Sequence, residues 1–125
     1  KQVKDRILKF ALTVPDEKTV FYHDLLREKL CGRADPTSSG HGSIDLILPG
    51  CHKASGLKRL IRRWNLSPRQ CAAFGDGGND VEMLRYCGFS FAMANAPQEV
   101  KAAAKDTCPS NEEDGVLVTL EKLFP

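Results

Sequence analysis

The chain has 125 residues, of which 42% are hydrophobic and 27% are charged, and its formal net charge is +2. This composition is typical of a globular protein with a buried core, and the small net charge gives no broad electrostatic basis for binding nucleic acid. Because no apolar run is long enough to span a bilayer, we also expect no membrane segment.

The five cysteines are scattered along the chain, without a Cys-x-x-Cys pair or a Cys/His cluster at zinc spacing. Their odd number argues against a complete disulfide framework. They are therefore predicted to be reduced and mostly buried thiols, which favours a cytoplasmic location.

The first part of the chain is predicted to fold as strand, helix, strand, strand. Residues 6–14 are rich in apolar and β-branched residues, which is typical of a strand. Residues 18–30 carry apolar residues at helical spacing and predict an amphipathic helix on a sheet. A short strand within residues 34–38 would pair as a hairpin with a clearer strand over residues 43–48. No catalytic cluster occurs here, so this part is interpreted as a scaffold or specificity unit.

Beyond Pro49-Gly50 the pattern changes to alternating helices and strands. The predicted elements are, in order, a helix over 52–64, a strand over 71–74, a helix over 79–86 with Gly88 as its C-cap, a strand over 89–93, a helix from 97, an edge strand at 107–108 and a helix over 116–124. Such alternation is typical of a parallel α/β sheet. We therefore place a domain boundary at Pro49-Gly50, which separates residues 1–48 from residues 49–125.

The most informative stretch runs from Ala72 to Leu84, where a short apolar run is followed by a glycine-rich turn with two aspartates. The glycines allow a sharp turn at the carboxyl end of the predicted strand, which is where parallel sheets bind ligands. Asp76 and Asp80 are hard to explain by burial alone, because a buried carboxylate needs a cation or hydrogen-bond donors. A metal ion or a lysine would meet that need.

Three polar elements are expected to converge at the carboxyl ends of the strands: Lys53, the turn from Asp76 to Asp80, and Asn95. Magnesium takes oxygen ligands and often uses one or two carboxylates together with a substrate phosphate. The glycine amides of the turn would favour an anion beside the metal, and Lys53 would neutralise phosphoryl charge.

Simpler interpretations of the same residues stay open at this point. Asn79 or Asp80 could serve only as the cap of the following helix, because Gly, Asn and Asp are common in turns. Lys53 could be an ordinary surface lysine near the start of a helix, and Asn95 an ordinary turn residue. The histidines show no partner spacing and are interpreted as surface or boundary residues.

Five stretches resemble, in order and spacing, segments of the haloacid dehalogenase (HAD) superfamily in its Cof-type sugar phosphatase branch with a class IIB cap. They are the last cap strand over residues 43–46, the third-motif lysine helix at Lys53 with Gly56-Leu57, the fourth motif from Gly75 to Leu84, the strand-end segment Ala92 to Ala96 and the loop Asn111 to Val116. Ala94 stands where this family usually has glycine. The similarity covers residues 43–124, and before them it rests on the pattern of elements alone.

The resemblance implies an α/β fold, in which residues 49–125 are the carboxyl-terminal half of a HAD-like, Rossmann-like parallel-sheet core. Residues 1–48 would be part of an α/β cap domain that precedes this core. The implied activity is that of a magnesium-dependent phosphomonoester hydrolase, which acts on small sugar phosphates through an aspartyl-phosphate intermediate.

By position, the resemblance assigns Asp76 as the magnesium ligand and Lys53 as the catalytic residue that stabilises the phosphoryl group and the nucleophile. Asp80 would be a second catalytic residue, which orients Lys53 or a metal-bound water. Asn79 would contact phosphate or the metal shell, and Asn95 would contact phosphate.

The family's first motif, Asp-x-Asp-x-Thr after an amino-terminal strand, does not occur in this sequence. That motif supplies the nucleophile, so the resemblance implies that the nucleophile lies outside the chain. We therefore expect the chain to be the carboxyl-terminal portion of a longer phosphatase and to be inactive by itself. It would associate with the missing amino-terminal half or with itself, because the strand over residues 71–75 would otherwise have an exposed edge.

Two other classes of function are kept open. The chain could be a non-catalytic module that binds phosphate and magnesium or docks a partner. A receiver-like regulatory domain also uses acidic residues with magnesium and a lysine. Its phosphoacceptor aspartate would have to follow an early strand, and Asp16 and Asp45 lie in unsuitable surroundings.

Overall fold

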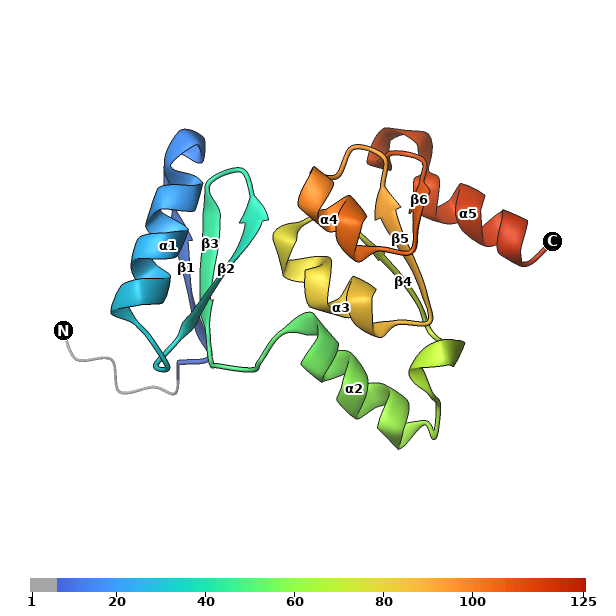
Figure 1. The fold of residues 1–125 in the computed structure, drawn as a ribbon, viewed down its shortest axis with the longest axis horizontal. Helices are drawn as coiled ribbons and strands as arrows, with labels where there is room; N and C mark the ends of the chain where they lie inside the picture. Colours follow the sequence, from blue (N-terminus) through green and yellow to red (C-terminus); the bar gives the residue numbers. More distant parts are fainter. Residues whose placement is uncertain (1–6) are drawn as a thin grey trace. The chain divides into compact units, whose positions relative to one another are not determined.

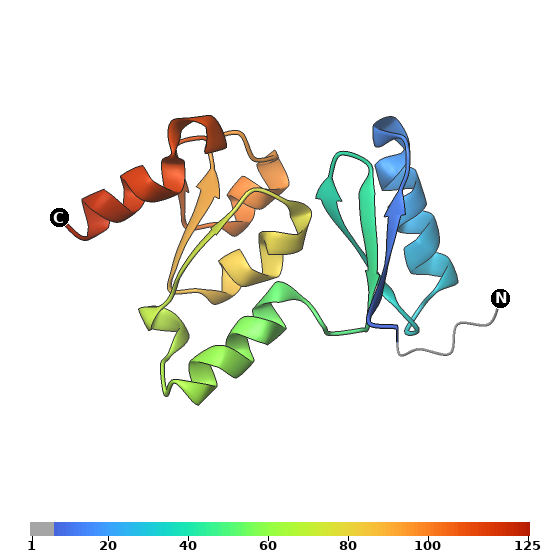
Figure 2. The same ribbon diagram turned by 180° about the vertical axis from the view of Figure 1, so that it is seen from behind.

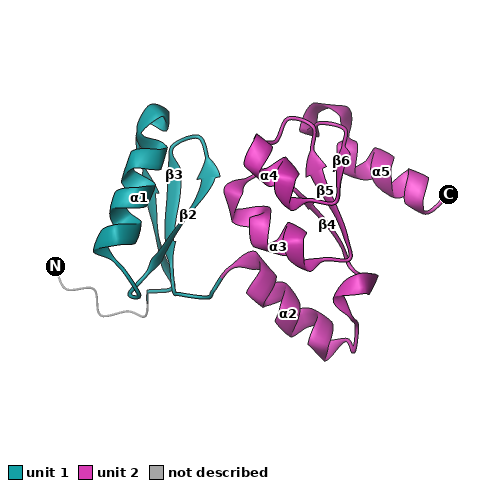
Figure 3. Cartoon of the chain, viewed as in Figure 1, with its two compact units in different colours: residues 1–51 teal, residues 52–125 magenta. Residues whose placement is uncertain are grey.

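The computed structural model of the chain describes residues 7–125. The chain divides into two compact units, Lys1–Cys51 and His52–Pro125 (Figure 3). None of the helices in these described residues is long and apolar enough to cross a membrane. The interpretation of the first part as a cap and of the second as half of an enzyme core stays a prediction.

The first unit is a three-stranded antiparallel sheet with one helix against it (Figure 1). The strand order is β1-β3-β2, and the elements are β1 (Lys9–Thr13), the 3-10 turn η1 (Asp16–Lys18), α1 (Thr19–Lys29), β2 (Asp35–Gly40) and β3 (Ser43–Ile47). The predicted hairpin is present, with Thr37 of β2 opposite Asp45 of β3. Because side chains alternate along a strand, the fully buried Ile44 and the neighbouring Asp45, which pairs with Lys9 at 2.8 Å, face opposite sides of the sheet.

The second unit is built around a parallel sheet of order β4-β5-β6. Its elements are α2 (Lys53–Arg63), η2 (Pro68–Gln70), β4 (Ala72–Gly75), η3 (Gly78–Asp80), α3 (Val81–Tyr86), β5 (Phe89–Met93), α4 (Gln98–Ala103), β6 (Asp106–Cys108), η4 (Asn111–Glu113) and α5 (Gly115–Leu123). Figures 1 and 2 show α3 and α4 on one side of this sheet and α5 on the other. The predicted alternation of helices and parallel strands is therefore confirmed.

The core of the second unit lies where α3 and α4 pack against the sheet. Leu84, Ala92 and Val100 are each at most 1% exposed. The parallel register sets Phe74 opposite Phe91, and the two rings stack with their centroids 5.1 Å apart. This packing fixes the relative positions of the strand ends, where the polar side chains lie.

Gly88 is not the C-cap of α3, contrary to the prediction. Cys87 is the cap residue, in an extended conformation. Gly88 lies against the backbone of Arg69, where an added Cβ would come within 2.4 Å of the Arg69 Cα. Its N–H also donates to the carbonyl of Pro68 at 2.7 Å. Gly88 is thus required by a close approach of two backbone segments.

The apolar face predicted for α2 is only partly covered by the described residues. Ile61 is 3% exposed, whereas Leu60 is 40% and Trp64 is 59% exposed. The β4 strand pairs with β5 on one side and, among residues 7–125, with no strand on the other. The sequence predicts that this edge of β4 lacks a partner strand, and in the described residues it is unpaired.

All five cysteines are free, but the prediction that they are mostly buried is wrong. Cys87 and Cys108 are buried, whereas Cys31 and Cys51 are exposed. The exposure of Cys71 is intermediate. Burial raises the pKa of the Cys87 and Cys108 thiols, so both stay protonated near neutral pH. Spacing along the sequence does not reveal on which face of its segment a cysteine lies.

We expect a maleimide reagent at neutral pH to label Cys31 and Cys51 in the folded protein and to label Cys87 and Cys108 only after unfolding. Burial and the raised pKa both lower the amount of accessible thiolate at the two buried positions. Peptide mass spectrometry of protein labelled with and without urea measures the difference. Labelling of Cys87 as fast as Cys31 without urea would contradict this core.

Candidate active site

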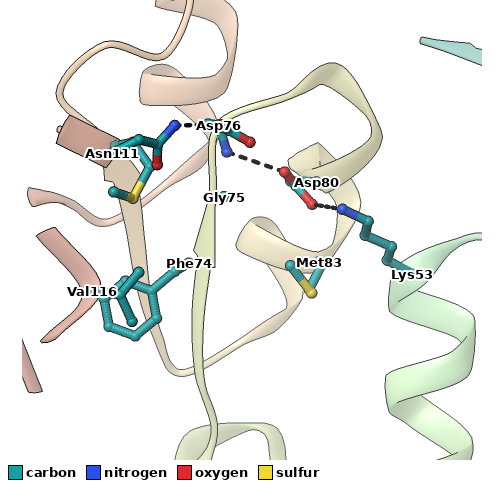
Figure 4. A pocket seen from close by; sticks show the side chains of 9 residues that line it. Lys53, Phe74, Gly75, Asp76, Asp80, Met83, Asn111 and Val116 are labelled. Carbon is teal, nitrogen blue, oxygen red and sulfur yellow. Dashed lines mark hydrogen bonds and ion pairs between the residues drawn. The ribbon is translucent and has the colours of Figure 1, made fainter. Parts of the chain in front are cut away.

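Four polar residues from separate segments meet where the parallel strands of the second unit end (Figure 4). Asp76 directly follows β4, Asp80 closes η3, Lys53 begins α2 and Asn111 begins η4. The carboxyl ends of parallel strands share one edge of the sheet, and the loops at this edge carry the side chains. The structure thus brings Lys53 together with the turn from Asp76 to Asp80, as the sequence suggests.

Asp80 is the buried centre of this group, with 3% of its surface exposed. Its Oδ1 accepts a hydrogen bond from Lys53 Nζ, with which it forms an ion pair. Its Oδ2 accepts hydrogen bonds from the backbone amides of Asp76 and Gly77, each at 3.1 Å. These donors supply what an ionised carboxylate needs when it leaves water. Asp80 therefore fixes the position of the Lys53 ammonium.

The glycine turn encloses Asp80 more closely than the sequence suggests. Gly77 donates its N–H to the Asp80 carboxylate, so this amide is not directed at an outside anion as expected. Gly75 is needed because an added Cβ would lie 2.5 Å from the Asp80 Cβ. The turn therefore packs closely around the Asp80 carboxylate and holds it in place.

Asp76 has the opposite environment, because it is exposed. Its Oδ2 accepts a hydrogen bond from the side-chain amide of Asn111 at 2.8 Å. Among residues 7–125 Asp76 forms no ion pair. A carboxylate that is held on one oxygen by a neutral donor can accept a cation on the other.

Asn79 and Asn95 lie differently with respect to this group. Asn79 Oδ1 is 3.5 Å from Lys53 Nζ, so its side chain sits beside the ammonium. Asn95 follows β5, and its Oδ1 accepts the backbone N–H of Asn111 at 3.1 Å. The structure therefore connects Asn95 to the site through Asn111.

Asn111 is the member of the group that sequence reasoning did not single out. Ser110 closes the turn around it, because its hydroxyl and its N–H donate to the Glu113 carboxylate at 2.6 and 3.0 Å and lower the pKa of Glu113. Asp114 then takes a left-handed conformation, with φ 50°, before α5 begins. The signal that could have identified Asn111 is its place shortly after the third parallel strand.

A pocket opens beside these groups (Figure 4). Its lining is polar at Lys53, Asp76, Asp80 and Asn111 and apolar at Phe74, Met83, Met93 and Val116, with Gly75 completing it. The apolar residues come from β4, α3, β5 and the start of α5. Apolar walls lower the local dielectric constant and so strengthen the electrostatic interactions of charged neighbours. The arrangement can hold a cation at Asp76 and an anion at the Lys53 ammonium.

The donor chemistry of this pocket fits Mg2+ through a single carboxylate. In the described part of the chain no three His, Cys, Asp or Glu residues are grouped to hold a metal. Mg2+ nevertheless commonly takes only one or two protein carboxylates and completes its octahedral shell with waters and substrate phosphate. Asp76 can supply one such carboxylate, whereas Asp80 is already paired with Lys53.

Comparison with known proteins gives a family match and close relatives. The model of a family described as haloacid dehalogenase-like hydrolase matches residues 1–120. The 5-amino-6-(5-phospho-D-ribitylamino)uracil phosphatase YbjI of Escherichia coli is 45% identical over 122 residues, which are 98% of this chain and 45% of that protein. The phosphatase of the same description from Bacillus subtilis, YitU, is 40% identical over 81 residues, which are 65% of this chain and 30% of that protein. The chain thus spans less than half the length of either relative.

Two of the solved structures that match the chain illustrate the shared fold. A protein of Streptococcus mutans superposes with a TM-score of 0.88 at 43% identity, over 93% of this chain and 44% of that chain. A haloacid dehalogenase-like hydrolase of Bacteroides thetaiotaomicron superposes with a TM-score of 0.76 at 27% identity, over 99% of this chain and 49% of that chain. The α/β fold is therefore common to this chain and to part of each of these larger proteins.

We expect Gly75→Ala to lose about 1–3 kcal/mol of unfolding free energy, because the new Cβ would displace the Asp80 side chain from its donors. Gly56→Ala is the matched control, since nothing lies within 4 Å of its Cβ position in α2. This control should leave stability unchanged or raise it by up to about 1 kcal/mol. Urea titrations of both variants measure the difference, and an unaffected Gly75→Ala protein would contradict the tight turn.

Proposed function

Because the chain belongs to the haloacid dehalogenase-like hydrolase family, we propose that it forms the metal- and lysine-bearing part of a phosphomonoester hydrolase. The observation that carries the proposal is the ion pair of Lys53 with the buried Asp80, in one pocket with the exposed carboxylate of Asp76. A fixed ammonium beside a carboxylate without a cation partner suits a phosphoryl group and a divalent metal.

Lys53 binds the phosphoryl group in this proposal. Its ammonium attracts the phosphoryl oxygens as a point cation and stabilises the negative charge that develops in the transition state. Asp80 holds the ammonium before substrate arrives, so little reorganisation is needed during the reaction. Asn79, beside the same ammonium, would contact the phosphate or the metal shell.

Asp76 would hold Mg2+, to which it offers one carboxylate. When bound, the ion supplies Lewis-acid stabilisation of a phosphoryl oxygen. The division between the two aspartates follows from their surroundings, because Asp80 is neutralised by Lys53 and Asp76 forms no ion pair among residues 7–125. Asn95 was expected to contact phosphate, and its bond to Asn111 supports an indirect role instead.

The attacking carboxylate comes from a further polypeptide segment, since this sequence contains no Asp-x-Asp-x-Thr motif. An aspartate oxygen of that segment would attack phosphorus while the bond from phosphorus to the substrate oxygen breaks. The acid/base aspartate of the same motif would give that oxygen a proton, so that it leaves as a neutral alcohol. Water then cleaves the aspartyl-phosphate. The edge of β4 that is unpaired in the described residues is where a strand bearing this aspartate would add. The segment would correspond to the part of the relatives that the chain does not span, although self-association is a second way to cover the edge.

The proposed substrate is a small phosphorylated metabolite of the cytoplasm, and in particular a sugar phosphate. The Escherichia coli relative at 45% identity is named for a phosphoribityl compound, which is of this chemical class. Residues 1–48 would form part of the cap that selects the substrate, and residues 49–125 would carry the reaction. The alternative is a non-catalytic fragment that binds phosphate and magnesium or docks a partner, and the absence of the nucleophile motif favours it for the isolated chain.

The test is a chimera in which the part of the Escherichia coli relative that this chain does not match is joined to the chain. We expect the chimera to hydrolyse 5-amino-6-(5-phospho-D-ribitylamino)uracil or other sugar phosphates with Mg2+, and the chain alone to be inactive. Phosphate release measures both. The proposal is wrong if the chain turns over phosphomonoesters as an isolated monomer, or if a folded chimera binds Mg2+ and phosphate without turnover.

Within the chimera, Lys53→Met should lower kcat by about 10²–10³-fold, because it removes the fixed cation from the transition state. Lys58→Met is the matched control on the same helix, since the Lys58 ammonium lies 4.9 Å from the centre of the Tyr86 ring and does not line the pocket. It should leave kcat unchanged. Steady-state assays compare the two variants, and equal effects would remove Lys53 from the proposed mechanism.

A further inference from the structure

Two asparagines connect strand ends of the second unit to the Asp76 carboxylate. Asn95, which follows β5, accepts the backbone N–H of Asn111 on its Oδ1 at 3.1 Å. Asn111, at the start of η4, donates from its Nδ2 to Asp76 Oδ2 at 2.8 Å (Figure 4). This Asn95–Asn111–Asp76 relay joins loops that follow three different strands.

We propose that Asn111 is a positioning residue that orients the Asp76 carboxylate for Mg2+, and that Asn95 acts through Asn111 by holding its backbone. The inference rests on the proposed function, because it requires Asp76 to be a metal ligand. It replaces the direct phosphate contact expected for Asn95 with a role in fixing a loop.

The hydrogen bond determines which oxygen of Asp76 is free for a cation. A donor on Oδ2 fixes the plane of the carboxylate and leaves Oδ1 available. Groups that hydrogen-bond to a metal ligand orient it and tune its affinity. Mg2+ demands near-ideal octahedral geometry, so it is sensitive to the orientation of each ligand. Asn111 therefore acts on metal affinity through the orientation of Asp76.

A neutral amide suits this task better than a charged side chain. Asn111 donates a hydrogen bond but brings no positive charge, so Asp76 keeps its full negative charge for a cation. Asp80 shows the contrast, because the Lys53 ammonium balances its charge. The two carboxylates of one turn are thus prepared for different partners.

The loop that carries Asn111 is held in place independently of Asp76. The bonds from Ser110 to Glu113 close its turn. Gly115 lies so close to Pro109 that an added Cβ would come within 1.9 Å of the Pro109 carbonyl oxygen. Because these contacts and Asn95 fix the loop, Asn111 can determine the orientation of the Asp76 side chain. The loop does not have to adapt to Asp76.

The test measures Mg2+ affinity by isothermal titration calorimetry of the chimera described above. Asn111→Ala should weaken Mg2+ binding by about 10–100-fold, the range typical of groups that hold metal ligands. Its kcat should recover towards the unsubstituted value at saturating Mg2+, because the proposed role of Asn111 is to orient Asp76 and not to act on the phosphoryl group. Asn95→Ala should weaken binding in the same direction. Asn95→Asp should restore most of the affinity, because it keeps an acceptor oxygen for the Asn111 N–H.

Glu112→Gln is the control for general disturbance of the loop, since Glu112 is exposed and adjacent to Asn111. It should leave the affinity for Mg2+ unchanged. Suppose that the unsubstituted chimera binds Mg2+. If the Asn111→Ala variant then binds Mg2+ equally well, or if Glu112→Gln loses as much affinity as Asn111→Ala, the relay is wrong. The proposed function stands in either case. If the unsubstituted chimera does not bind Mg2+, the proposed function is wrong and the relay falls with it.

Discussion

The geometry of the candidate active site depends on the burial of one carboxylate. Asp80 is 3% exposed, and taking an ionised carboxylate out of water costs several kcal/mol unless donors replace the lost hydration. The Lys53 ammonium and two backbone amides are those donors. Lys53 begins α2, and the amides belong to the turn after β4. The hydrogen bonds to Asp80 therefore connect the start of α2 to the turn after β4. The Lys53 side chain stays half-exposed and lines the pocket.

Sequence reasoning could predict this part of the site because its causes are local and topological. Asp76 and Asp80 follow an apolar run through a glycine turn, and the alternation of helices and strands places Lys53 at the same edge of the sheet. The argument that a buried carboxylate needs a cation or donors applies to Asp80. It does not apply to Asp76, which is exposed. The pattern alone could not tell which of the two would be buried.

Other features could not be predicted because they depend on contacts between distant backbone segments. The bond from Asn111 to Asp76 requires the left-handed residue Asp114 and the turn closed by Ser110, and many loops with the same composition would not form them. The sequence pattern predicts Gly88 as a helix cap, but the structure shows that glycine is needed there because the Arg69 backbone lies too close for a side chain. Likewise, the spacing of apolar residues in α2 predicts that one face of the helix packs against an apolar surface. It does not indicate which segment provides that surface.

The position of the unpaired edge of β4, next to the pocket, suggests where the proposed nucleophile would come from. Phe74 and Gly75 are on β4 and line the pocket together with Lys53 and Asp76. A strand added along this edge would end where β4 ends, because parallel strands in register share their carboxyl side. A carboxylate at that end would face the Lys53 ammonium and the free oxygen of Asp76. The proposed site thus needs one added strand to supply the attacking group. The Lys53 ammonium and the Asp76 carboxylate, which would act with that group in this proposal, are held in place by Asp80 and Asn111.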